Sequence, residues 1–106
     1  MSIEDRTPVE LILDDVWYER RRQIDKWGWQ RHPDDTGAIA YKVRREAFTQ
    51  INDWRASRAL PAEWDDILLE EVYEALSETD VAKLRKELVQ VAAVCVAWIE
   101  DIDSRG

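Results

Sequence analysis

The chain has 106 residues, 45% hydrophobic and 36% charged, and its formal net charge is −8. This length fits one domain, residues 1–106, and the acidic balance argues against a general nucleic-acid binder, which needs a basic face. Three Gly and three Pro leave few turns for an all-β fold. The single cysteine, Cys95, excludes an intrachain disulfide, and we expect it to be a small core residue. We see no signal peptide and no apolar run long enough to span a bilayer, so we expect a cytoplasmic protein without a membrane partner.

The first predicted helix begins at Pro8 and runs to about Trp27, because Thr7 can cap it and Pro suits its first position. Its inner face starts apolar and then turns polar. The polar residues on that face are Glu19, Arg20 and Gln23. Either this half of the helix leaves the core and is solvated, or the three residues line a pocket. For this helix alone, the solvated interpretation is the simpler one.

Gly28 suits the left-handed C-terminal cap of that helix, and a loop follows as far as Gly37. The loop holds the only histidine, His32, and no second His or Cys lies near it at metal-site spacing. Trp27 and Trp29 flank Gly28. Two indoles in this position can stack on a nucleobase, although anchoring of the loop is the commoner use of tryptophan.

The second predicted helix covers about Ala38 to Ser57, with Asp34, Asp35 or Thr36 as its cap. Apolar residues recur at helical spacing along one face, which we expect to be the inner face. They are Ala40, Val43, Ala47, Ile51 and Trp54. The other face carries basic residues and is most simply solvated. They are Lys42, Arg44, Arg45 and Arg55.

Two further helices complete an all-α, four-helix bundle. Pro61 is expected to start the third, and Thr79 or Asp80 to cap the fourth, which should run to about Asp103. From Leu88 to Ile99 the fourth helix is apolar nearly all round. A surface helix would not be, so this stretch is either central or packed against another subunit, as in a homodimer or homotetramer.

The acids of these two helices stand in unusual places. Glu71 falls inside the apolar arc of the third helix and Glu74 on its edge, and Glu87 lies between two apolar rows of the fourth. Helices joined by a short turn run antiparallel, so the three glutamates can converge, with Gln90 one turn further on. Converging side-chain oxygens suit Mg²⁺, or Mn²⁺, while the simpler alternative is a solvated face. A ferritin-like di-iron site is excluded, because neither Glu74 nor Glu87 has a His three residues later.

The segments LLEEVYEAL (68–76) and ELVQVAAV (87–94) resemble the MazG-like branch of the all-α nucleoside triphosphate pyrophosphohydrolases. The pattern of that family is EExxE, a gap, then ExxD. The segment ERRRQIDKWGWQRHP (19–33) is also similar to the first helix and following loop of small MazG-like proteins of phages and actinobacteria. The stretch from Gly37 to Leu60 is less distinctive.

The resemblance implies a four-helix protomer that oligomerises, depends on Mg²⁺ and cleaves a nucleotide to a monophosphate and pyrophosphate. It places Glu71, Glu74 and Glu87 at metal-ligand positions, as the catalytic set, with Glu70 beside them. Where the family has Asp, this chain has Gln90, which completes or adjusts the metal shell with one charge fewer. Residues expected to contact phosphate, base or sugar are Arg20, Gln23, Lys26, Trp27, Trp29, His32, Lys83 and Lys86.

Two alternatives stay open at this stage. Gln90 is compatible with a protein that binds a nucleotide without cutting it, such as a phage-type sponge for a nucleotide signal. The apolar fourth helix is compatible with a small interaction module that has no ligand.

Overall fold

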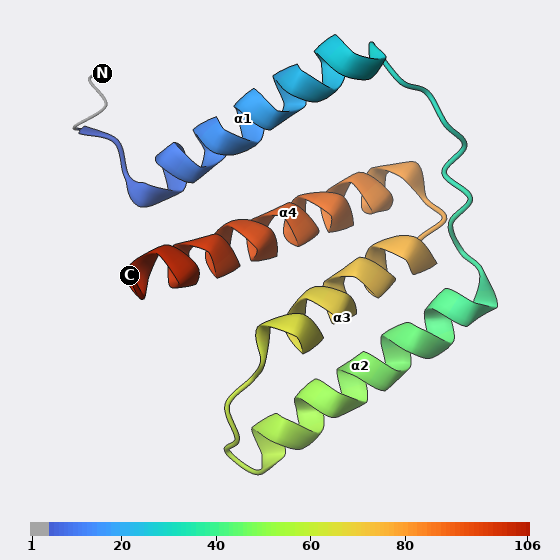
Figure 1. Ribbon diagram of the computed structural model, residues 1–106. Helices are drawn as coiled ribbons and strands as arrows, with labels where there is room; N and C mark the ends of the chain where they lie inside the picture. The colour runs from blue at the N-terminus through green and yellow to red at the C-terminus, as the bar shows by residue number, and fades with distance from the viewer. Residues whose placement is uncertain (1–4) are drawn as a thin grey trace. The chain divides into compact units, whose positions relative to one another are not determined.

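The computed structural model describes residues 5–106, and within this range the chain is all-helical with no strand. The four helices are α1 (Pro8–Trp27), α2 (Ile39–Ser57), α3 (Trp64–Ser77) and α4 (Val81–Ser104) (Figure 1). No helix in this range is both long enough and apolar enough to cross a membrane. The predicted all-α class with four helices is therefore confirmed.

The ends of α1 are those predicted from the sequence. The Thr7 hydroxyl accepts a hydrogen bond from the backbone N–H of Glu10 at 3.2 Å, so Thr7 is the N-cap. Gly28 follows the last turn with φ +69°, and its N–H donates to the carbonyl of Ile24 at 2.7 Å. Glycine is favoured here because a positive φ costs it nothing.

The second helix begins about where it was predicted, but its predicted cap is wrong, and so is the predicted start of the third helix. The N-cap of α2 is Ala38, whose side chain makes no capping hydrogen bond, in place of Asp34, Asp35 or Thr36. The third helix begins at Trp64, after Glu63, and not at Pro61. A proline is compatible with a first helical turn but does not enforce one. The cap of α4 is as predicted, because the Asp80 carboxylate accepts from the backbone N–H of Lys83 at 2.9 Å.

The chain divides into two compact units, which we describe separately. The first contains α1 and the end of α4 from Val96 onward, and the second, residues 34–95, contains α2, α3 and the first part of α4. In the second unit α2 and α3 run antiparallel. Arg55 of α2 pairs with Glu63 just before α3, while Gly37 before α2 donates to the carbonyl of Leu76 at the end of α3 at 2.8 Å.

The predicted inner face of α2 is wrong. Its apolar stripe is exposed, with Val43 63%, Ile51 39% and Trp54 49% accessible. The half-buried face is the polar and aromatic one. Its members are Tyr41, Arg45, Phe48, Thr49, Asn52 and Arg55. This face packs on α3 because α3 offers carboxylates and an aromatic ring that pair with these side chains, which an apolar stripe would leave unpaired.

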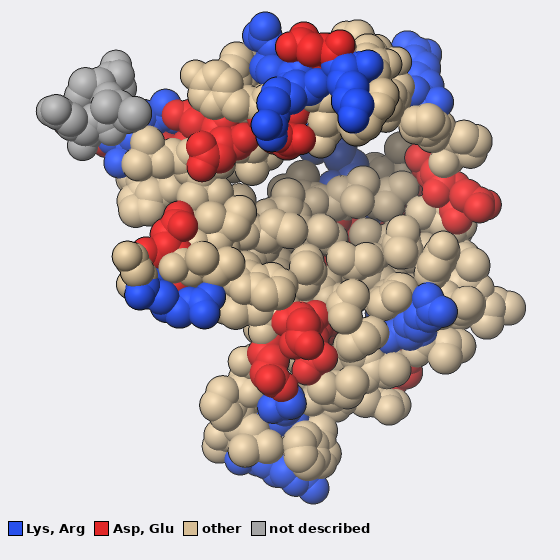
Figure 2. Space-filling model, viewed as in Figure 1, with Lys and Arg blue, Asp and Glu red and all other residues tan. Residues whose placement is uncertain are grey.

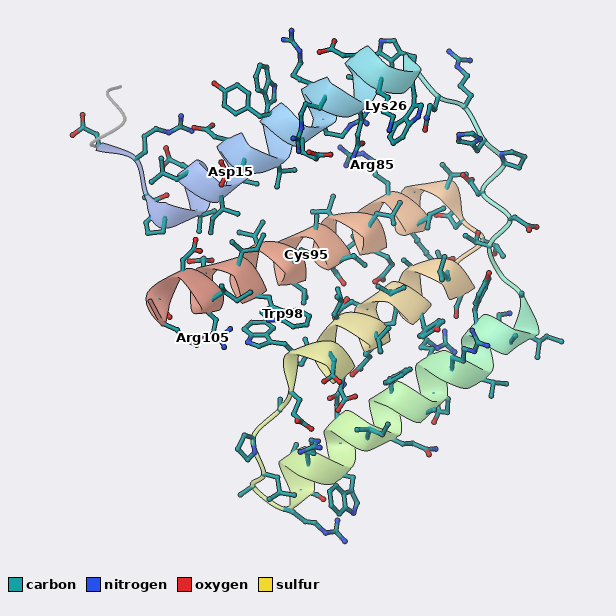
Figure 3. All side chains as sticks on the ribbon, viewed as in Figure 1. Asp15, Lys26, Arg85, Cys95, Trp98 and Arg105 are labelled. Carbon is teal, nitrogen blue, oxygen red and sulfur yellow. The ribbon has the colours of Figure 1, made fainter. Side chains whose placement is uncertain are left out.

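The apolar stretch of α4, which was expected to be central or packed against another subunit, is partly exposed. Leu84 is buried, but Leu88 and Val89 are 52% and 55% exposed. Cys95, predicted to be a core residue, is exposed as well (Figure 3). Glu87 and Gln90 are instead half-buried. The side of α4 that carries these two polar residues is thus more covered than part of its apolar stretch.

Candidate metal centre

Three glutamates of the second unit converge. One carboxylate oxygen from each of Glu71, Glu74 and Glu87 lies within 4.8 Å of the others. Two of them belong to α3, where a spacing of three residues places them on one face, and Glu87 comes from the second turn of α4. All three side chains are half-buried. We call these residues the glutamate cluster.

The glutamate cluster is electrostatically strained in the absence of a cation. The pKa of Glu74 is raised from an ordinary value of 4.5 to about 7, first by burial and then by the charges of Glu71, Glu87 and Glu70, whereas Arg45 opposes the rise. Burial likewise raises the pKa of Glu71, followed by the charges of Glu87 and Glu70. Protons or a cation are therefore favoured here, because either one removes the repulsion.

Gln90 lies next to the glutamate cluster. With its amide nitrogen turned toward the acids, it donates to Glu87 Oε2 at 3.1 Å and to Glu71 Oε2 at 3.2 Å. The opposite orientation would point the amide oxygen at acceptors only, so the donating orientation is the satisfied one. Gln90 thus ties together one acid of α3 and one acid of α4.

The structure places Glu70 differently from its predicted role beside the metal. Its carboxylate accepts hydrogen bonds from two residues of α2, from the Thr49 hydroxyl at 3.3 Å and from the Asn52 amide. Glu70 is not part of the glutamate cluster. It connects α2 to α3 and adds negative charge near Glu71 and Glu74.

Aromatic contacts fix α3 against α2 at Tyr73, which lies in the sequence between the two acids that α3 contributes to the cluster. The Tyr73 ring stacks on Phe48 with a centroid separation of 5.7 Å and an interplanar angle of 8°. The Arg44 guanidinium lies 5.8 Å from the centre of the same ring and donates to the Tyr73 hydroxyl at 3.4 Å. These contacts set the rotation of α3, and with it the direction of Glu74.

The turn between α3 and α4 sets the position of Glu87. The Glu78 carboxylate accepts from the backbone N–H groups of Thr79 and Asp80, each at 3.1 Å. With the Asp80 cap, this turn begins α4 at Val81, one residue after the cap and within the two turns that carry Glu87. Lys83 and Lys86, predicted to meet phosphate, are exposed on the same two turns and belong to the same unit as the glutamates.

The other predicted substrate contacts lie in the first unit. They are Arg20, Gln23, Lys26, Trp27, Trp29 and His32. Arg20 donates to the Gln23 side chain at 2.7 Å, and both border a hollow of about 310 Å³ with Glu19 and Ile99. Glu19 and Gln23 are half-buried and Arg20 is exposed, and the role of this face in binding a substrate stays a prediction. Lys and Arg side chains gather over α1 (Figure 2).

The two indoles at the end of α1 are accessible to solvent. Trp27 is 56% and Trp29 85% exposed, and Lys26 Nζ lies 4.8 Å from the centre of the Trp27 ring. His32 is exposed in the loop that follows. Their predicted role in base recognition stays a prediction.

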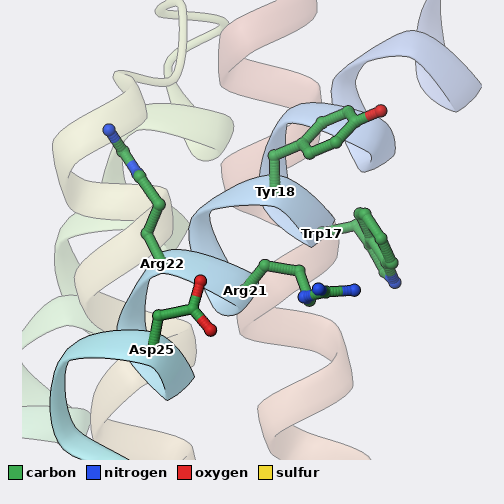
Figure 4. Close-up of a pocket in the computed structure, with 5 residues that line it drawn as sticks. All are labelled: Trp17, Tyr18, Arg21, Arg22 and Asp25. Carbon is green, nitrogen blue, oxygen red and sulfur yellow. The ribbon is translucent and has the colours of Figure 1, made fainter.

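Sequence reasoning missed a second hollow on α1, of about 480 Å³ (Figure 4). Trp17 and Tyr18 contact each other edge to face at 5.0 Å, and Arg21 covers the Trp17 ring at 5.2 Å. Exposed aromatic residues at consecutive positions were the signal for it. None of the glutamates contributes to this hollow.

Comparison of the chain with protein-family models, with characterised proteins and with solved structures found no match.

Proposed function

We propose that this protein is a Mg²⁺-dependent nucleotide pyrophosphohydrolase of the MazG-like type, which converts a nucleoside triphosphate or related nucleotide to a monophosphate and pyrophosphate. The observation that carries this proposal is the convergence of three half-buried carboxylates from two helices. The donor set fits Mg²⁺ or Mn²⁺, which prefer oxygen ligands and keep positions open for phosphate. The raised pKa values of Glu71 and Glu74 indicate a site that gains from a positive charge.

In this proposal Glu71, Glu74 and Glu87 hold the cation. The bound cation supplies charge neutralisation for the phosphates and activation of water. Gln90 keeps the acids of α3 and α4 close together, and rotation of its amide would offer an oxygen ligand in place of the nitrogen. Lys83 and Lys86 stand on the same turns of α4 and would meet phosphate charge.

The test is incubation with Mg²⁺ and a panel of nucleotides, including cyclic and ADP-ribose-type species, followed by mass spectrometry. We expect pyrophosphate and a monophosphate from at least one nucleotide. Glu71→Gln and Glu87→Gln should each reduce turnover by at least a hundredfold. Glu46→Gln, an exposed glutamate of α2, should not change it. Equal activity in all three variants would refute the metal-holding role of the cluster.

A second function is favoured by Gln90. The Gln90 amide donates hydrogen bonds to two of the three acids. An acid at this position would add a fourth negative charge, so the affinity of this site for a cation should be lower than that of a site with four acids. A protein of this kind could bind and retain a nucleotide intact. In the same experiment, this function predicts an unaltered nucleotide that co-purifies with the protein and no pyrophosphate.

We further propose that the protein forms a homodimer or homotetramer, with the exposed apolar stripe of α2 in the interface. Val43, Ile51 and Trp54 are large, apolar and accessible on one face of α2. Contiguous apolar surface of this kind is typical of protein–protein contacts. The interaction-module alternative uses similar surfaces but predicts a different partner and no ligand.

A further inference from the structure

The face of α2 that packs on α3 carries a cation that the sequence pattern assigned to solvent. Arg45 is half-buried, whereas its neighbours Arg44 and Glu46 are exposed. Arg45 shares its face with Thr49 and Asn52, which follow it by four and seven residues and therefore lie one and two turns along the same side. Both of these residues form hydrogen bonds with α3.

The register of the two antiparallel helices determines what faces Arg45. Thr49 donates to Glu70 at 3.3 Å, and Asn52 donates to the carbonyl of Asp66 at 3.3 Å. A step of one turn toward the start of α2 is thus matched by a step of one turn toward the end of α3. One further turn toward the start of α2 leads from Thr49 to Arg45, and one further turn toward the end of α3 leads from Glu70 to Glu74. The register therefore places Arg45 opposite Glu74.

The electrostatics agree with this register. Arg45 is the positive group that lowers the pKa of Glu74, against burial and the surrounding acids. Ion pairs within 4.0 Å occur at several places among residues 5–106, but Arg45 takes part in none of them. Its guanidinium is close enough to act on Glu74, yet its donors are not committed to a carboxylate.

We propose that Arg45 is a substrate-binding residue of the glutamate cluster, whose guanidinium binds the phosphate chain of the nucleotide. This inference rests on the proposed function of the cluster, and it names the phosphate-binding residue. A guanidinium suits the role because it is always charged and presents paired donors to phosphate oxygens. Arg45 belongs to the same compact unit as Lys83 and Lys86, which are proposed to meet phosphate charge from α4.

An alternative role for Arg45 is purely structural, as a counter-charge that keeps Glu74 ionised and the two helices together. The two roles differ in what a substitution does. Loss of a counter-charge weakens folding, because the acids of the glutamate cluster then repel one another more strongly. Loss of a phosphate contact weakens binding of the anion while the protein keeps its stability and its cation.

The experiment uses inorganic pyrophosphate as the probe, titrated by calorimetry at pH 8 into the full chain with Mg²⁺. Three variants are compared with wild type: Arg45→Gln, Arg45→Lys and the control Lys42→Gln, which removes an exposed charge of the same helix. Binding of Mn²⁺ alone and the melting temperature are measured for each. Turnover of nucleotides is followed separately.

We expect pyrophosphate to bind at least tenfold more weakly to Arg45→Gln, with Arg45→Lys in between and Lys42→Gln equal to wild type. Mn²⁺ binding should stay equal or become tighter. Equal pyrophosphate affinity in Arg45→Gln, no pyrophosphate binding by wild type, or a parallel loss of Mn²⁺ affinity and melting temperature would each overturn the inference. If pyrophosphate binding depends on Arg45 but no nucleotide is cleaved, the hydrolase proposal fails and the role of Arg45 stands.

Discussion

Glu74 offers the most direct measurement of strain in the glutamate cluster. Its pKa rises from 4.5 to about 7 in the folded protein. At pH values between these two, the protein therefore takes up a proton when it folds. A carboxyl group whose pKa is raised on folding favours the folded state at low pH, and this contribution is lost as pH rises through about 7. The metal-free protein should therefore lose stability as pH rises from about 4.5 to about 7, and it should be less stable at pH 8 than at pH 5.5.

The size of this loss follows from the pKa difference. The change from 4.5 to about 7 corresponds to an upper limit of about 3 kcal/mol. Because the Glu74 carboxylate is only partly shielded from water, we expect about 1 to 2 kcal/mol. For a domain of this size, this is about 5 °C or more in melting temperature.

Glu74→Gln should remove the effect. Glutamine resembles the protonated acid and can still donate to Glu71, so the variant should melt about 5 °C above wild type at pH 8 and within 1–2 °C of it at pH 5.5. Mg²⁺ should raise the melting temperature of wild type at pH 8 and raise that of the variant much less. Thermal melts followed by circular dichroism at both pH values measure this.

The control for this series is Glu46→Gln, which removes one negative charge from the exposed side of α2. This substitution should change the melting temperature only slightly, and by the same amount at pH 5.5 and at pH 8. If Glu74→Gln lowers the melting temperature by the same amount at pH 5.5 and pH 8, the cluster is not under repulsion and the reasoning is refuted.

Three further predictions concern other parts of the molecule. Gln90→Asp should lower metal-free stability at pH 8, since it replaces two donated hydrogen bonds with a fourth charge, and should tighten Mn²⁺ binding about tenfold or more in calorimetry; unchanged Mn²⁺ affinity would contradict a place for Gln90 in the metal shell. Val43→Glu should shift the protein to a lower oligomeric state in light scattering, whereas Lys42→Glu should not; a monomeric wild type would remove the α2 interface. Gly37→Ala should destabilise by about 1–3 kcal/mol in denaturant melts, because Gly37 has φ +92° and an added Cβ would collide with the methyl group of Thr79. Thr79→Ser should rescue it only in part, since the strained backbone remains.

The helices themselves followed from local chemistry. Thr7 and Asp80 were predicted to cap the starts of helices and Gly28 to cap the end of one, and each does so. The role of Ala38 as the N-cap of α2 and the start of α3 at Trp64 could not be predicted in this way. Neither start depends on a side-chain capping bond, so the tertiary contacts of the preceding loop decide where the backbone turns helical.

The proximity of Glu71, Glu74 and Glu87 could be anticipated, because all three departed from the apolar pattern and a short turn joined their helices. Which face of α2 packs on α3 could not be anticipated. Periodicity identifies an apolar stripe but not the surface that covers it. In this protein hydrogen bonds to Glu70 and stacking on Tyr73 select the polar face, and this brings Arg45 inward. The metal and nucleotide assignments stay predictions.

The two hydrogen bonds from Gln90 have a consequence for when the site is occupied. A cation that recruits the amide oxygen must first break both of them, because the side chain cannot offer nitrogen to the acids and oxygen to an ion in one orientation. An ion that is held by the three carboxylates alone leaves both hydrogen bonds intact. Gln90 in this orientation would therefore leave the remaining positions around such an ion to water or to phosphate oxygens.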